Sequence, residues 1–342
     1  GAEVIKVERP GSGDDTRQWG PPFDPSGRAT YFESVNRNKS SIAIDLGDPA
    51  GLASAQELAA GADVVVENFR PGLMDQLGLG YDDVRAANPA VIYCSVTGFG
   101  SGAGAQLPGY DLLIQGLGGL MSITGQAGGE PQKVGVALVD VLAGLYATVG
   151  ILAALRHRDA TGEGQLVEVD LFGALLASLV NQASAFTAGG VVPERMGNAH
   201  PSISPYELLP TADGDLLLAV GNDRQFTAAC EVLGEAALAT DERYATNPAR
   251  VANRVVLREQ LVGLLAARPA AEWAQLLTQA RVPAGAVNDI AAAFALGEQL
   301  GMEPIVEIPR ADGSTARVTR NPIRLSATPP TYRLPPPDLP GA

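Results

Sequence analysis

The sequence predicts an α/β protein built on a parallel sheet. In the first half of the chain, short runs of β-branched residues alternate with stretches of helical pattern, which is typical of βα units. A hydrophobic fraction of 46% with 18% charged residues is typical of a packed globular protein. We expect strands at Val4–Glu8, Ser41–Asp45, Asp63–Asn68 and Val91–Val96, and helices at Pro49–Ala60, after an Asp48 cap, and at Tyr81–Ala87.

The rest of the chain divides into a helical section, a distinct middle and a Pro-rich end. A long helix is expected at Val139–His157, then a turn at Thr161–Gly164, a strand at Gln165–Asp170 and a second long helix at Leu171–Thr187. The section from about 205 to 300 has a strand of its own, Leu216–Gly221, and several amphipathic helices. The Pro-rich end is expected to lie over a surface without regular structure.

The formal net charge of −14 excludes the nucleic-acid-binding class, because phosphate backbones are bound by clustered Lys and Arg. A net-acidic protein can bind an anion only where positive charge or helix N-termini are concentrated locally. The basic residues that fall early in the chain are candidates for such a patch: Arg9, Arg37, Lys39 and Arg70.

The two cysteines, Cys94 and Cys230, are far apart and have no metal or redox spacing, which favours a reduced, cytoplasmic setting. No run of 18 apolar residues is free of polar ones, so no membrane span is expected. Gly1 opens directly on a strand-like run, as if a βα unit preceded it. Ligands of parallel sheets bind at the carboxyl ends of strands, which directs attention to Glu67–Arg70 and Thr97–Gly100.

An ordered series of short motifs resembles one known family, the class III CoA-transferases, which include formyl-CoA transferase and carnitine CoA-transferase. No single motif is diagnostic, but the series extends from Gly1 to about Pro337. It consists of Gly1–Glu8 with Gly11–Asp14, Asn36–Ser40 leading to Ile44–Leu46, Asp63–Gly72, Gly109–Asp111, Met121–Gly125, and Asp140 ahead of Gly144.

The resemblance implies a large doubly wound, Rossmann-like domain with a parallel sheet, a smaller α+β domain and an interlocked homodimer of two open rings. In this chain the large CoA-binding domain is expected at 1–195, the small domain at 205–305, and a C-terminal segment returning to the large domain at 306–342. The pattern of βα units, distinct middle and tail is consistent with this division.

Asp140 stands among apolar residues at the start of a helical pattern. The local sequence alone favours a structural role, in which the aspartate caps the helix by accepting backbone N–H bonds. The resemblance implies a catalytic role, because Asp140 falls at the position of the family's catalytic aspartate. A partly desolvated carboxylate is a competent nucleophile toward a thioester, and a helix N-terminus stabilises the anionic states.

Tyr110 distinguishes this chain from one group of enzymes with the same fold. The α-methylacyl-CoA racemases resemble this chain but carry a histidine at the position of Tyr110, and they use it with the relay aspartate as a proton-transfer pair. Proton abstraction beside a thioester needs a base on each face, so tyrosine disfavours racemisation. The alternative structural role is a core aromatic at Tyr110, with Asp111 capping the helix after it.

The resemblance also implies the CoA-binding residues, for which arginine suits phosphate and an apolar surface suits adenine. Some relatives carry a basic residue where this chain has Gln76, which puts a phosphate contact there in doubt. No metal and no permanently bound cofactor is expected, since CoA and acyl-CoA are substrates. The CoA-binding residues are Arg9, Ile44, Asp45, Leu46, Asn68, Phe69, Arg70, Pro108, Gly109, Tyr110 and Asp111.

The segment from Gly197 to Tyr206 is similar to the branch of the family that acts on small dicarboxylates such as succinyl-CoA and glutarate. His200 and Arg195 are the candidates for holding a substrate carboxylate, and the alternative for His200 is a linker histidine that binds no ligand. The expected function is therefore CoA transfer from an acyl-CoA such as succinyl-CoA to a carboxylic acid. The alternatives are a racemase-like isomerase and a non-catalytic CoA-binding protein.

Overall fold

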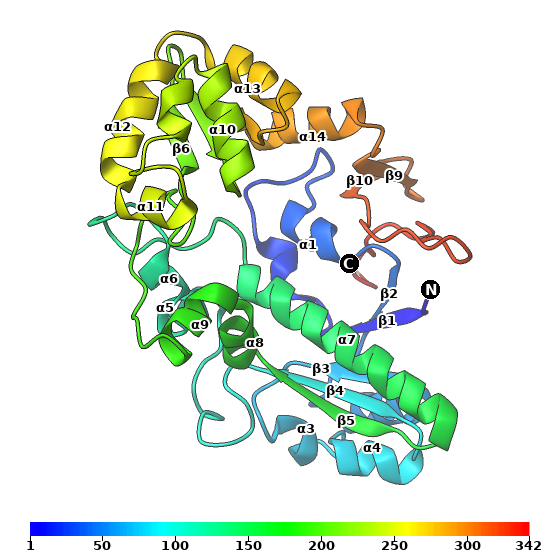
Figure 1. Cartoon of the computed structure of the whole chain (residues 1–342). Helices are drawn as coiled ribbons and strands as arrows, with labels where there is room; N and C mark the ends of the chain where they lie inside the picture. The colour runs from blue at the N-terminus through cyan, green and yellow to red at the C-terminus, as the bar shows by residue number, and fades with distance from the viewer. Residues whose placement is uncertain (342) are drawn as a thin grey trace. The chain divides into compact units, whose positions relative to one another are not determined.

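The computed structural model describes residues 1–341, which form a mixed α/β fold of two compact units. Unit 1 comprises Gly1–Leu107, Leu145–Val169 and the described part of Ile290–Ala342, and unit 2 comprises Pro108–Gly144 and Asp170–Asp289. Figure 1 traces the chain through both units. The helix α7 (Leu138–Thr161) contributes residues to each unit.

Unit 1 contains two parallel strand pairs. β1 (Val4–Glu8) pairs in parallel with β2 (Lys39–Ala43), and β3 (Val64–Glu67) pairs in parallel with β4 (Ile92–Thr97) in a sheet that β5 (Gln165–Asp170) completes. The other elements of unit 1 are η1 (Asp15–Gln18), α1 (Thr30–Val35), α2 (Pro49–Gly61), α3 (Leu73–Gln76), α4 (Tyr81–Ala87), α14 (Ile290–Gln299) and the antiparallel hairpin β9 (Ile305–Pro309) and β10 (Thr315–Thr319).

The helices α2 and α4 of unit 1 pack on the sheet that contains β3. Asp48 caps α2 as the sequence predicts, by accepting hydrogen bonds from Ala50 N (3.1 Å) and Gly51 N (2.9 Å). Residues of α2 and α4, including Ala55 and Val84, are buried with Tyr93 of β4 in one core cluster. Figure 1 shows α4 and α7 on opposite faces of this sheet.

The Pro-rich end of the chain has no regular structure and is attached to the N-terminal segment of unit 1. Arg310 is buried, donates to Pro336 O (2.8 Å) and forms an ion pair with Glu33. Arg28 forms ion pairs with Asp312 (2.8 Å) and Asp338 (2.9 Å). These contacts explain how a segment without helix or strand is held in place.

Unit 2 has an antiparallel sheet of β6 (Tyr206–Pro210), β7 (Asp215–Ala219) and β8 (Ala284–Ala286), covered by helices. Its core includes Phe226, Leu257, Trp273 and the fully buried Arg250, whose guanidinium donates to Ser204 O, Tyr244 O and Asp223 Oδ1. The other elements are α5 (Asp111–Leu117), α6 (Leu120–Ile123), α8 (Leu171–Ser178), α9 (Val180–Thr187), α10 (Asp223–Val232), η2 (Ala236–Ala239), α11 (Asn247–Ala252), α12 (Arg254–Leu265) and α13 (Ala270–Gln279).

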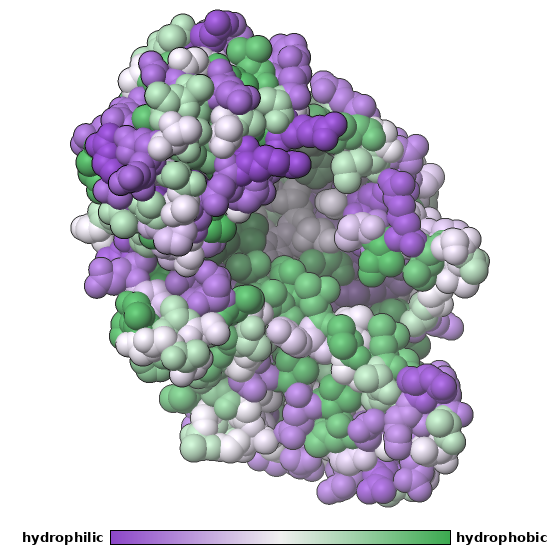
Figure 2. All heavy atoms as spheres, viewed as in Figure 1, coloured by the Kyte–Doolittle hydropathy of each residue, from purple (hydrophilic) through white to green (hydrophobic). Residues whose placement is uncertain are grey.

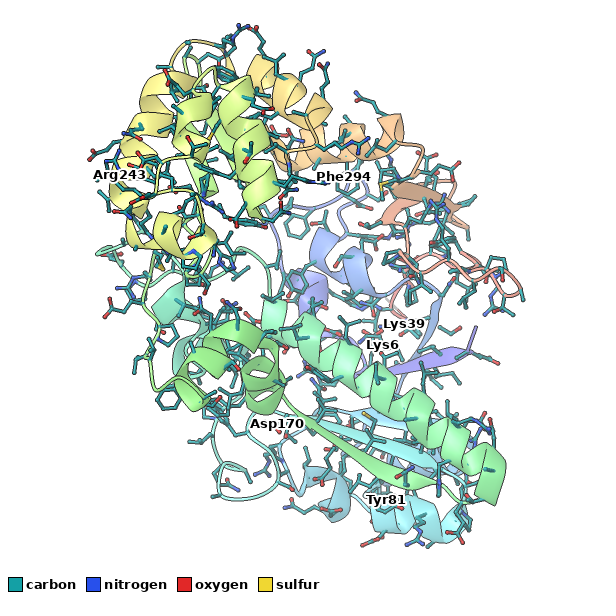
Figure 3. All side chains as sticks on the ribbon, viewed as in Figure 1. Lys6, Lys39, Tyr81, Asp170, Arg243 and Phe294 are labelled. Carbon is teal, nitrogen blue, oxygen red and sulfur yellow. The ribbon has the colours of Figure 1, made fainter. Side chains whose placement is uncertain are left out.

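The single helix expected at Leu171–Thr187 is wrong, because two helices meet there. α8 begins after Asp170, which caps it by accepting from Gly173 N (2.6 Å) and lies where β5 meets α8 (Figure 3). The break comes at Val180, whose φ of 44° lies in the left-handed region that β-branched residues rarely adopt. No Gly or Pro marks this break in the sequence.

α7 buries several of its alanines and exposes several of its large apolar side chains. Ala143, Ala147 and Ala154 are buried, whereas four apolar residues are 55–65% exposed: Val141, Leu145, Val149 and Leu152. Their spacing places them along one stripe of the helix, where Figure 2 shows apolar side chains gathered on the surface. We call these four residues the α7 stripe.

α7 is, within residues 1–341, the one helix long and apolar enough to cross a membrane, with a mean hydropathy of 2.1 over an 18-residue window and 22% of that window buried. α7 has this property by length and composition only. No uninterrupted apolar run marks this helix in the sequence, because Asp140, Tyr146 and Thr148 interrupt the run and Arg156 follows it.

Candidate functional site

Asp140 lies in the first turn of α7 and is exposed. It does not cap that helix, which already begins at Leu138. The N–H groups of Val139 and Asp140 instead point to Oδ1 of Asp111, at 2.7 Å and 3.4 Å. The interpretation of Asp140 as the capping residue is therefore wrong, and its carboxylate is not committed to the helix end.

Asp111 caps α7 from another helix. It is the first residue of α5, and its side chain accepts from the start of α7 rather than from the start of its own helix. Tyr110, which precedes it, is 72% exposed. Both parts of the structural alternative, a core tyrosine and an aspartate that caps the following helix, are thus contradicted.

The electrostatic surroundings of Asp140 favour its use as a nucleophile, because they raise the pKa of its carboxyl group. Although the side chain is exposed, the protein excludes part of its hydration, which raises the pKa of the carboxyl, and the negative charge of Asp111 raises that pKa further. A more basic carboxylate is a better nucleophile. The ionised form that attacks is consequently lost, as pH falls, at a higher pH than for an ordinary aspartate.

Gln115 belongs to the same cluster and was not predicted from the sequence. It follows Asp111 by four residues, so both lie on one face of α5, and its side-chain amide donates to Asp111 Oδ2 at 2.6 Å. The available signal was a single amide side chain in the otherwise apolar run Leu112–Leu117, at helical spacing from an aspartate.

A second set of predicted residues lies at the carboxyl ends of strands in unit 1. β1 and β2 end in register, with Glu8 opposite Ala43, so Arg9 and the segment Ile44–Leu46 follow adjacent strand ends. Ile44 is buried and its N–H continues the pairing to Glu8 O (2.9 Å), whereas Arg9 and Asp45 are exposed. Arg9 pairs with Asp15 and donates to Gly13 O (3.4 Å).

The segment Asn68–Arg70 follows the carboxyl end of β3 and is exposed throughout. The Phe69 ring is 43% exposed, and the backbone N–H of Phe69 donates to Glu67 Oε2 (2.8 Å). An aromatic face and an arginine at a strand end are suited to a nucleotide base and its phosphates.

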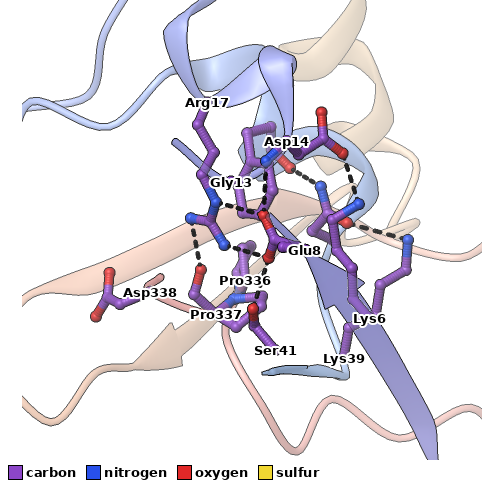
Figure 4. Close-up of polar contacts among 12 residues, drawn as sticks. Lys6, Glu8, Gly13, Asp14, Arg17, Lys39, Ser41, Pro336, Pro337 and Asp338 are labelled. Atoms are coloured by element: carbon purple, nitrogen blue, oxygen red, sulfur yellow. Dashed lines mark hydrogen bonds and ion pairs between the residues drawn. The ribbon is translucent and has the colours of Figure 1, made fainter. Parts of the chain in front are cut away.

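A buried carboxylate organises the loop that follows Arg9 (Figure 4). Glu8 is 5% exposed and accepts four hydrogen bonds: from Arg17 Nε (2.8 Å) and Nη2 (2.7 Å), Ser41 Oγ (2.6 Å) and Asp14 N (2.9 Å). Burial alone would raise the pKa of Glu8, but these donors outweigh it and lower the pKa to about 2. Gly13 has a φ of +65°, and a Cβ there would lie 2.9 Å from Glu8 Oε2, so glycine is required.

The basic residues proposed for an anion-binding patch differ in environment. Lys6 and Lys39 come from the neighbouring strands β1 and β2 (Figure 3). Burial lowers the pKa of Lys39, the nearby charge of Lys6 lowers it further, and its ammonium group donates to Asn36 Oδ1 (3.1 Å). Arg37 lies over the Tyr332 ring, at 5.9 Å. Arg9 and Arg70 are the exposed members of the proposed patch.

His200 and Arg195 lie in unit 2. Nδ1 of His200 accepts from Ser202 N (3.1 Å), so the neutral ring carries its proton on Nε2, and the ring contacts Tyr206 edge to face. Arg195 donates through Nη1 to Ser122 O (3.2 Å), while its enclosed Nε has no hydrogen-bond acceptor among the described residues.

The predicted residues therefore form two sets, one in each unit. Unit 2 brings Asp140 together with Asp111 and Tyr110, which follows Pro108 and the exposed Gly109. Unit 1 presents Arg9, Ile44–Leu46 and Asn68–Arg70 at strand ends. Among residues 1–341, no group of three or more His, Cys, Asp or Glu side chains is arranged to hold a metal ion.

Comparison with known proteins identifies the family. The sequence matches the model of CoA-transferase family III over residues 1–342. It is 45% identical over 350 residues to a succinate–glutarate CoA-transferase of Agrobacterium fabrum, covering 99% of this chain and 86% of the relative. It is 43% identical over 296 residues to the succinyl-CoA:glutarate CoA-transferase of Homo sapiens, covering 86% and 67%. A crystal structure of a CAIB/BAIF family protein from Brucella suis has a TM-score of 0.86 and 44% identity, covering 99% and 89%. The chain belongs to CoA-transferase family III.

Proposed function

We propose that this CoA-transferase moves CoA from succinyl-CoA to a dicarboxylic acid, with Asp140 as the covalent relay. Two named relatives transfer CoA between succinate and glutarate. The observation that carries the assignment of Asp140 is its place in the first turn of α7. The residue is exposed, and its carboxylate does not cap the N-terminus of this helix. Asp111 supplies the cap instead.

The reaction proceeds through balanced exchanges on one carboxylate. Asp140 attacks the thioester carbonyl, the C–S bond breaks, and a mixed anhydride and CoA thiolate form. The thiolate attacks the Asp140 acyl carbon, which releases the donor acid and leaves an aspartyl-CoA thioester. The acceptor carboxylate then displaces the thiolate from Asp140, and the thiolate attacks the acceptor carbonyl, which frees the new acyl-CoA and Asp140. Neither water nor an oxidant enters.

Exchange of radiolabel between a free acid and its acyl-CoA tests this function. We expect label from succinate to enter succinyl-CoA, and a panel of carboxylic acids with succinyl-CoA to identify the acceptor. A protein that binds CoA without exchange would be a binding protein. Deuterium incorporation at the α-carbon without acid exchange would indicate the racemase-like alternative. That alternative is disfavoured because this chain has Tyr110 at the position of the racemase histidine.

Arg9 is proposed to contact a phosphate of the CoA nucleotide. Replacing Arg9 by alanine should weaken CoA binding by about 1.5–3 kcal/mol, the range for a charge-assisted hydrogen bond. Binding of a pantetheine thioester that lacks the nucleotide should change little. Both affinities can be measured by isothermal titration calorimetry.

Arg317→Ala is the matched control, because the Arg317 and Glu307 side chains are 64% and 65% exposed, close to the 65% and 75% of Arg9 and Asp15. The control should leave both affinities unchanged, since exposed pairs contribute little. Equal weakening of both ligands by Arg9→Ala would make Arg9 a structural residue and move the nucleotide site elsewhere.

We also propose that the chain is an obligate homodimer, with the doubly wound domain and interlocked rings that the family resemblance implies. The α7 stripe supports this, because a soluble monomer rarely exposes a continuous row of large apolar side chains. Light scattering at micromolar concentration should give twice the chain mass, and Leu145→Lys should impair assembly. A stable wild-type monomer, or binding of the α7 stripe to lipid vesicles, would contradict the proposal.

His200 and Arg195 are proposed to hold the distal carboxylate of the dicarboxylate. His200 offers Nε2–H as a donor, and Arg195 has an enclosed donor without an acceptor among the described residues. Both groups suit a carboxylate.

A further inference from the structure

Gln115 is an amide enclosed in the apolar helix α5, and it has no exposed surface. Its side chain is satisfied at both ends: Oε1 accepts from Val134 N (2.9 Å), and Nε2 donates to Asp111 Oδ2 (2.6 Å) and, at 3.5 Å, to Val136 O. These partners fix the orientation of the amide, because only the oxygen can accept from Val134 and only the nitrogen can donate to a carboxylate.

A fully buried amide at this position is not explained by packing. Burying an amide without partners is unfavourable, whereas leucine or methionine would fill a similar volume without needing hydrogen-bond partners. Gln115 makes hydrogen bonds to two parts of the protein. These are the loop that leads into α7, at Val134 and Val136, and the carboxylate of Asp111.

The two oxygens of Asp111 have separate partners. Oδ2 is held by Gln115, and Oδ1 receives the N–H groups of Val139 and Asp140 at the start of α7. A carboxylate held at one oxygen cannot rotate without losing the bonds at the other. The orientation of the cap on α7 therefore depends on the amide of Gln115.

We propose that Gln115 is a positioning residue of the transfer reaction, which holds Asp140 in its reactive position through Asp111 and the loop before α7. This inference rests on the proposed function, in which Asp140 is the nucleophile. Displacing a reacting group by about 1 Å can cost on the order of 100-fold in rate. The hydrogen bonds of Gln115 go to Asp111, Val134 and Val136, so its proposed effect on Asp140 is indirect.

The ionisable groups around this amide are few. α5 packs against α6 and α8, neither of which carries an ionisable side chain. The groups on the remaining neighbours are Asp111 itself, Tyr110 just before α5, Lys133 in the loop, whose Nζ donates to Val134 O (3.3 Å), and Asp140 on α7. A new acid at position 115 would thus face mainly negative charge.

Two substitutions separate positioning from a structural role. Gln115→Leu removes both ends of the amide, and we expect kcat to fall about 10- to 100-fold while the Kd for CoA stays within about two-fold. Gln115→Glu keeps the shape, and its protonated acid can still donate to Asp111. Its kcat should approach that of the wild type near pH 5 and fall as rising pH ionises the new carboxyl, whose pKa is raised by burial and by Asp111.

Gln56→Leu is the control, since Gln56 also donates to backbone carbonyls, of Leu77 (3.1 Å) and Gly78 (3.4 Å), and neither of these acceptors belongs to α7 or to the loop before it. It should keep the wild-type kcat and pH profile. Folding is checked by circular dichroism, and if Gln115→Leu does not fold, the pH profile of Gln115→Glu decides.

The outcomes distinguish the inference from the function on which it rests. If the wild type shows no exchange that depends on Asp140, the proposed function fails and the inference fails with it. If the wild type exchanges acids but folded Gln115→Leu keeps its kcat, or Gln115→Glu follows the wild-type pH profile, the inference alone is overturned. A purely structural amide would lower stability without creating a new pH dependence.

Discussion

Replacing Asp140 by asparagine is expected to abolish CoA transfer, by on the order of 10⁴-fold or more, while the protein stays folded and binds CoA. An amide has the shape of the carboxylate but is not a nucleophile toward a thioester. The helix should not suffer, because the start of α7 is capped by Asp111, and the N–H of residue 140 that points to Asp111 is retained in the variant. Asp140→Ala should lose the same activity.

Asp48→Asn provides the matched control for that experiment. Asp48 is a true capping residue, so asparagine should replace it with little loss of stability or activity. Hydroxylamine or borohydride added during turnover of the wild type should trap an adduct on the peptide that contains Asp140, identified by mass spectrometry. An active Asp140→Asn variant, or an adduct that maps consistently to Asp111, would remove Asp140 from the mechanism.

The elements of the fold were predictable where local pattern and tertiary pairing agree. Val4–Glu8 and Gln165–Asp170 are strands with the predicted bounds, and Tyr81–Ala87 is a helix with the predicted bounds. β2 begins two residues earlier than expected, because its pairing with Val4 and Ile5 of β1 recruits Lys39 and Ser40, which have little strand preference. The break at Val180 depends on contacts that the local sequence does not encode.

The candidate site was predictable from local sequence only in part. Asp140 itself was identified through the family resemblance, while its local setting favoured a cap. The true cap, Asp111, accepts from Val139, 28 residues away in sequence, and the buried amide of Gln115 reaches Val134 in the loop, 19 residues further on. Hydrogen bonds between distant segments leave no periodic signal in the sequence. Only the folded structure therefore reveals that Asp111 caps α7 and that the carboxylate of Asp140 does not. The domain bounds, the CoA contacts and the cytoplasmic location stay predictions.

Replacing Glu8 by glutamine is expected to lower the free energy of unfolding by about 3–5 kcal/mol, the range for leaving a buried charge without its partner. Glu8 makes a bidentate ion pair with Arg17, whose side chain is only 16% exposed and also donates to Pro337 O (3.0 Å). The amide of glutamine would also present N–H groups to donors such as Asp14 N. Urea unfolding at pH 7 measures this loss.

The pH dependence of stability separates this ion pair from a simple packing defect. Because the pKa of Glu8 is lowered from 4.5 to about 2 in the folded protein, its contribution is fully present above pH 4.5 and is lost as pH falls toward 2; it amounts to about 3 kcal/mol. Wild-type stability should therefore decline through that interval, and the difference between wild type and Glu8→Gln should shrink there. Glu307→Gln, at an exposed pair with Arg317, should cost less than about 1 kcal/mol at any pH. A difference between wild type and Glu8→Gln that stays constant from pH 7 to pH 2 would show that the buried charge of Glu8 does not stabilise the loop that carries Arg9.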